Sequence, residues 1–156
     1  MTILFNTAHN HQPSTATVAY SDSALRQDLL RLHVAWRKFQ SRRDRDAVYR
    51  YLAAVYELVE WWTVDKCANA RAAQVLDFCG VETTSNVEPF AAVILCTSSP
   101  KKVDTKTRSK WSRALRYAAA VKEPGVSLRR FMRRRGGINE CAARYGRLVR
   151  NGSQIV

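Results

Sequence analysis

The sequence has few of the residues from which catalytic and metal sites are usually built. It contains three histidines, two of which form a His9–His11 pair, and four cysteines, none of them in the CxxC spacing of zinc and thiol-redox motifs. It also lacks a phosphate-binding loop and the GxSxG and HExxH motifs. A metal ion needs more ligands than two imidazoles provide. We therefore expect a protein that is not an enzyme and that binds neither a metal nor another cofactor.

Long apolar runs are also missing. The longest, Phe90–Cys96, is far shorter than the roughly 20 residues that span a bilayer. Residues 1–20 lack the basic start and long apolar stretch of a signal peptide. We expect a cytoplasmic protein with reduced thiols and no membrane partner, nucleoid-associated in a bacterium, and a nuclear location would fit equally well in a eukaryotic cell.

Acidic residues are scarce in the last part of the chain. Residues 1–95 hold ten basic and ten acidic residues, whereas residues 96–156 hold sixteen basic residues against three acidic ones. The whole net charge of +13 therefore lies in the second segment. Eleven of its sixteen cations are arginine, whose planar fork suits phosphate. This concentration favours a polyanionic partner.

The neutral segment carries the periodicity of amphipathic helices. Apolar residues recur every three or four positions from Leu25 to Phe39 and again from Val48 to Trp62. A further helix is expected over residues 64–78, and Phe90–Cys96 also favours a helix. Whether residues 44–79 form one helix or two stays open. We predict a flexible arm over residues 1–20, followed by a bundle of three to four helices over residues 21–96.

Two features of this bundle suggest contacts. Apolar residues surround Trp61 and Trp62 on more than one side, so a third element or a second subunit should cover them. We expect a surface for partners, including a homodimer formed through the helices of residues 21–79. Asp44 and Asp46 lie among arginines in the link between the first two helices, and we expect ion pairs there.

The basic segment is predicted to be a folded module of three helices over residues 101–150. Polar residues 97–107, with Pro100, mark its boundary. Helices are expected over about 104–121, from Ser127 as a cap, and from Ile138 with Asn139 as its cap. Apolar residues recur at helical spacing in all three, which a disordered basic tail would not need. The fold class is therefore all-α, a helical bundle followed by a small basic module.

The cations of this module fall on the outer sides of the predicted helices. Tyr117 is placed with them, where it would either stack on unpaired bases or belong to the core. The candidate nucleic-acid-binding residues are Lys106, Lys110, Arg113, Arg116, Tyr117, Arg129, Arg130, Arg133, Arg134, Arg135, Arg144 and Arg147.

These features predict a nucleic-acid-binding protein of regulatory or architectural function, with duplex DNA favoured over RNA. Two alternatives remain. The basic module could dock an acidic protein while the bundle serves as a scaffold, or the protein could bind RNA or the ribosome. Net charge by itself does not distinguish these partners.

Overall fold

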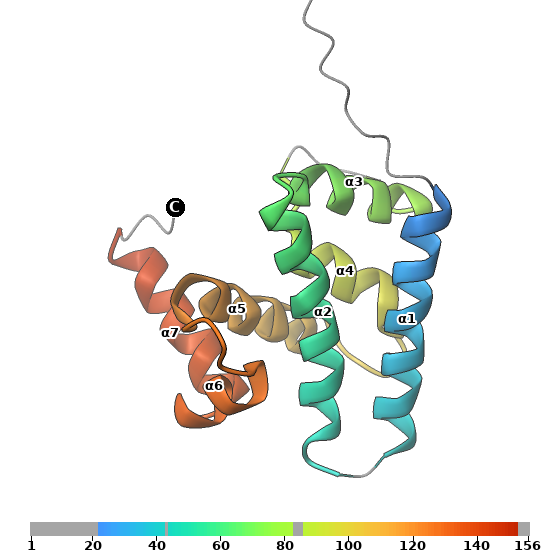
Figure 1. The fold of residues 1–156 in the computed structure, drawn as a ribbon. Helices are drawn as coiled ribbons and strands as arrows, with labels where there is room; N and C mark the ends of the chain where they lie inside the picture. Colours follow the sequence, from blue (N-terminus) through green and yellow to red (C-terminus); the bar gives the residue numbers. More distant parts are fainter. Residues whose placement is uncertain (1–21, 43, 83–85, 153–156) are drawn as a thin grey trace, which may run out of the picture.

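A computed structural model describes residues 22–42, 44–82 and 86–152, and the regular secondary structure of this part of the chain consists of helices, without strands. The predicted all-α class is confirmed. The predicted N-terminal arm and the His9–His11 pair lie outside the described residues. The seven helices (Figure 1) are α1 Asp22–Ser41, α2 Ala47–Val64, α3 Ala68–Phe78, α4 Pro89–Thr97, α5 Thr105–Val121, α6 Leu128–Arg134 and α7 Ile138–Arg150.

Helices α1 and α2 form an antiparallel hairpin (Figure 1). The apolar residues that predicted the first helix lie on its packed side, with Leu25, Leu29, Leu32 and Trp36 all buried. The second stripe is buried in the same way along α2. Burial of one face thus accounts for the 3.6-residue period of both segments.

Residues 44–79 form two helices, which settles the question that periodicity left open. α2 ends at Val64, and Lys66 has a φ of 56°, a left-handed conformation that interrupts the helix before α3. α3 lies across one end of the hairpin and packs on α4 (Figure 1). Glu88 caps α4 by accepting hydrogen bonds from the backbone N–H groups of Phe90 and Ala91 at 3.1 and 2.6 Å.

The starts of α5, α6 and α7 follow local capping chemistry. Asp104 accepts a hydrogen bond from the N–H of Thr107 at 2.6 Å, and Ser127 accepts one from the N–H of Arg130 at 3.3 Å. The predicted cap of α7 is wrong, because Asn139 lies inside the first turn and Gly137 precedes the helix. Gly137 has a φ of 90° and a ψ of −176°, a conformation that only glycine adopts readily.

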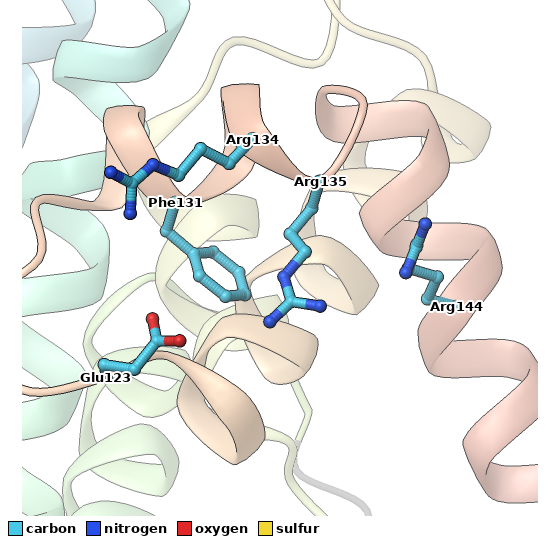
Figure 2. Close-up of a pocket in the computed structure, with 5 residues that line it drawn as sticks. All are labelled: Glu123, Phe131, Arg134, Arg135 and Arg144. Atoms are coloured by element: carbon cyan, nitrogen blue, oxygen red, sulfur yellow. The ribbon is translucent and has the colours of Figure 1, made fainter.

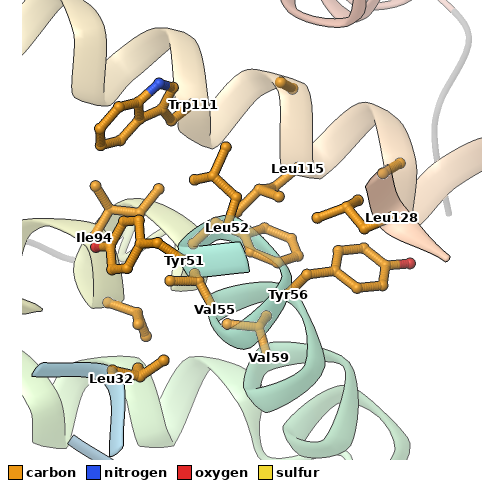
Figure 3. Packing of buried hydrophobic residues seen from close by; sticks show 14 of the residues in the cluster. Leu32, Tyr51, Leu52, Val55, Tyr56, Val59, Ile94, Trp111, Leu115 and Leu128 are labelled. Atoms are coloured by element: carbon orange, nitrogen blue, oxygen red, sulfur yellow. The ribbon is translucent and has the colours of Figure 1, made fainter. Parts of the chain in front are cut away.

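One hydrophobic cluster contains buried residues from all seven helices. The predicted module boundary falls on the link between α4 and α5, and the cluster continues across it through Trp111. The ring of Trp111 lies 6.4, 6.1 and 6.0 Å from those of Trp36, Phe39 and Tyr51, measured between centroids. Figure 3 shows Trp111 and Leu115 of α5 facing α2. Aromatic contacts therefore fix α5 against the α1–α2 hairpin.

Candidate nucleic-acid interface

The candidate cations lie on the outside of α5, α6 and α7. All eleven are exposed or partly exposed, while the apolar residues between them are buried. Leu115, Phe131 and Cys141, one from each helix, are at most 2% exposed. The amphipathic pattern of the basic segment is thus that of packed helices whose charged sides face solvent.

Tyr117 does not lie with these cations, and its predicted outer position is wrong. Its side chain is 6% exposed, and its ring lies 5.8 Å from that of Phe131, measured between centroids. The interaction of its hydroxyl with Arg144 of α7 is the largest cause that raises the pKa of that guanidinium. Both α6 and α7 pack on this side of α5, so stacking of Tyr117 on a base would require these helices to move.

Two of the α6 arginines are held by a carboxylate from the other half of the chain. Arg129 and Arg133, one turn apart, both donate to Asp46, the residue before α2. Asp44 forms the expected local pair, with Arg50 at 3.1 Å. Asp46 instead bridges residues that are 83 and 87 positions away, which local sequence patterns cannot indicate. The candidate interface therefore contains a carboxylate of the protein itself, that of Asp46, which sequence patterns did not place there.

Glu140 holds a second pair of cations on α7. Its carboxylate accepts from Arg147 at 2.6 Å and from Arg144 at 3.1 Å. The hydrogen bond from Arg147 is the largest favourable cause that holds the pKa of Glu140 below its ordinary value. Glu140 thus orders both guanidinium groups and offsets one of their charges.

Three candidate arginines converge on a pocket of about 290 Å³. Arg134 and Arg135 come from the end of α6, and Arg144 comes from α7. Phe131 and Glu123 complete the lining (Figure 2). The Arg135 guanidinium lies 5.6 Å from the centroid of the Phe131 ring. Within the described residues, neither Arg134 nor Arg135 has a carboxylate within ion-pair distance.

A second pocket, of about 500 Å³, lies between α4, α5 and α7 and brings Arg113 and Arg116 together. Arg116 lies 4.5 Å from the centroid of the Tyr145 ring. Arg108, which is not one of the candidate residues, also lines this pocket, and its Nη1 atom is buried. Lys106 and Lys110 are not among the described residues that line these two pockets.

The described residues contain no group of three or more histidine, cysteine or acidic side chains that could hold a metal ion. No helix in this part of the chain is both long and apolar enough to cross a membrane. No protein-family model, curated protein or solved structure matches the chain, so its function has to be inferred from this site.

Proposed function

We propose that α5, α6 and α7 bind nucleic acid through its phosphates, with duplex DNA favoured over RNA, and that the protein acts as a regulatory or architectural factor without catalysis. The observation that carries this proposal is the placement of the charge. The segment that holds the whole net charge of +13 contains the three packed helices α5, α6 and α7, and its candidate cations face outward from them. Such a surface attracts phosphates independently of base sequence.

The contact at Asp46 supports an oxyanion-binding role for α6. Two guanidinium groups, from Arg129 and Arg133, bind the two oxygens of one carboxylate. Arginine presents its donors to a phosphate in the same way. Helix α6 therefore spaces its arginines so that two of them can hold one oxyanion.

The organisation that we propose has two parts. Residues 101–150 form the binding module, and residues 21–96 form a bundle that carries an association surface. Several large apolar side chains of the bundle helices are exposed: Leu30, Trp61, Val64 and Phe78. Exposed apolar residues of this size support self-association, for which a homodimer is the simplest arrangement.

An acidic protein is the second candidate partner, and the same contact favours it. Two arginines of α6, Arg129 and Arg133, already bind a protein carboxylate, that of Asp46. The basic module would then dock an acidic segment of another chain. An RNA or ribosomal partner would use the same phosphate contacts as DNA.

A competition assay separates these partners. A labelled random-sequence duplex is bound at low salt and then challenged with unlabelled duplex, single-stranded RNA or polyglutamate. We expect the duplex to be the strongest competitor for each unit of charge. Stronger competition by RNA would indicate that RNA, and not duplex DNA, is the favoured nucleic acid. Stronger competition by polyglutamate would favour an acidic protein as the partner. Failure to bind the random duplex at low salt would refute the proposal.

A further inference from the structure

We propose that the pocket lined by Arg134, Arg135, Arg144, Phe131 and Glu123 is a phosphate-binding site that takes one phosphate group of a nucleic-acid strand. The identity of the strand rests on the proposed function, but the binding of phosphate itself does not. The lining comes from three places in the chain: the end of α6, the middle of α7 and the link after α5.

Two of the three guanidinium groups of this pocket, those of Arg135 and Arg144, are held in place before any ligand binds. Arg135 lies against the ring of Phe131, which is 2% exposed. Arg144 donates a hydrogen bond from Nε to the carboxylate of Glu140 at 3.1 Å. Figure 2 shows the Arg135 guanidinium between Phe131 and Arg144, with Arg134 on the other side of the ring. Preorganised donors lose little conformational freedom when an anion binds.

The contacts of the other arginines of α6 indicate which kind of ligand Arg134 and Arg135 are suited to bind. Arg129 and Arg133 already hold the carboxylate of Asp46, whereas Arg134 and Arg135 pair with no described carboxylate. The pocket of about 290 Å³ lies just below the range of roughly 300–1,000 Å³ that is typical of drug-sized ligands. The pocket therefore has room for a small oxyanion, whose several acceptor oxygens suit the guanidinium donors.

Glu123 gives this pocket a property that a general basic surface would not have. Among the described residues that line the pocket it is the one carboxylate, and Figure 2 shows it below Arg134 and beside Phe131. Its negative charge opposes an incoming phosphate. Glu123→Gln should therefore strengthen phosphate binding, by about two- to fivefold for one partly screened charge.

The first experiment uses inorganic phosphate alone, titrated into the full chain at constant ionic strength while the arginine Nε–H signals are followed by NMR. We expect saturable shifts at Arg134, Arg135 and Arg144. Combined Arg134→Gln and Arg135→Gln substitutions should weaken this binding by about tenfold or more, since hydrogen bonds to charged groups are lost. The circular dichroism spectrum would confirm that the variant remains folded.

Matched controls separate the pocket from general charge. Arg37→Gln with Lys38→Gln removes two exposed cations of α1, which are outside both this pocket and the candidate interface, and should leave phosphate binding unchanged. Asp77→Asn removes one acid from α3, which lies far from α6 in Figure 1, and should not reproduce the gain of Glu123→Gln. Equal effects of pocket and control substitutions, or no saturable shift with phosphate, would overturn the proposal.

The second experiment asks which phosphate of a strand occupies the pocket. Duplexes with hydroxyl ends and with 5′-phosphate ends are compared, using the wild type and the Arg134→Gln, Arg135→Gln variant. A loss of affinity for both duplexes indicates a phosphodiester within the strand, and a loss confined to the phosphorylated duplex indicates a terminal phosphate. Duplex binding that the variant leaves unchanged would overturn the pocket proposal alone. Phosphate binding without any duplex binding would instead refute the proposed function and leave the pocket site standing.

Discussion

Replacing Asp46 with asparagine is expected to strengthen nucleic-acid binding, because it releases two arginines of α6. Asp46 is the carboxylate partner of both Arg129 and Arg133. Asparagine has nearly the same size, and Asp46 makes no side-chain capping bond to α2 that the substitution would remove. The variant therefore changes the charge at the interface with little change in shape.

The magnitude follows from counterion release. Each additional phosphate contact on duplex DNA adds about −0.9 to the slope of log K against log salt, so two freed arginines add about −1.8. Between about 200 and about 50 mM salt, the affinity of the variant relative to the wild type should then increase about 12-fold. The arginine side chains are 49% and 54% exposed, and exposed ion pairs contribute at most about 1 kcal/mol each. The fold should therefore survive a loss of no more than about 2 kcal/mol.

The assay is fluorescence anisotropy of a labelled random duplex across a salt series. Asp44→Asn is the matched control, because it removes the same charge two residues away but releases Arg50, which belongs to α2. We expect the control to keep the wild-type slope. An identical slope for Asp46→Asn and the wild type would refute the inference that Arg129 and Arg133 face the bound strand.

Three further predictions concern stability. Trp111→Ala should lower the free energy of unfolding, measured by urea denaturation, by about 3–5 kcal/mol, because a buried aromatic ring is removed. A loss below about 1 kcal/mol would contradict the packing of α5 on the hairpin. Gly137→Ala should lower the free energy of unfolding by about 1–3 kcal/mol in the same assay, because alanine disfavours a φ of 90°. An unchanged midpoint would mean that the backbone at the start of α7 can take another conformation at no cost in stability. The lowered pKa of Glu140 means that its ion pairs stabilise the fold above its ordinary value of 4.5 and that this stability is lost as the pH falls through the lowered pKa. Melting curves of the wild type and Glu140→Gln should therefore differ near neutral pH and converge in acid, whereas a constant difference would contradict the pairing with Arg144 and Arg147.

Much of the helical structure could be predicted because a helix that buries one face has apolar residues at every third or fourth position of its sequence. The stripe from Leu25 to Trp36 and the polar caps Asp104 and Ser127 are local signals, and each marks a helix that the structure contains. The break between α2 and α3 carries no such signal, because a lysine at position 66 gives no indication of its left-handed conformation. The cap of α7 was predicted at the wrong residue for a similar reason. Two adjacent glycines precede this helix, and they allow the cap to lie at more than one residue.

The candidate interface was predictable in composition but not in arrangement. The helical wheel separates apolar from charged residues, yet it does not show that both α6 and α7 cover Tyr117. Nor could it bring Asp46 to Arg129 and Arg133, because that contact depends on how α6 packs against α2. Long-range packing therefore decides which cations are paired and which face solvent alone.

The central claim is that the basic helices bind nucleic acid through several phosphates. The most direct measurement is the affinity of the wild-type chain for a random duplex as a function of salt. If about six phosphates are contacted, log K should fall against log salt with a slope of about −5, and replacing Arg133, Arg134 and Arg135 with glutamine should make that slope shallower without unfolding the chain. Undetectable binding at low salt, or a slope near zero, would contradict the claim.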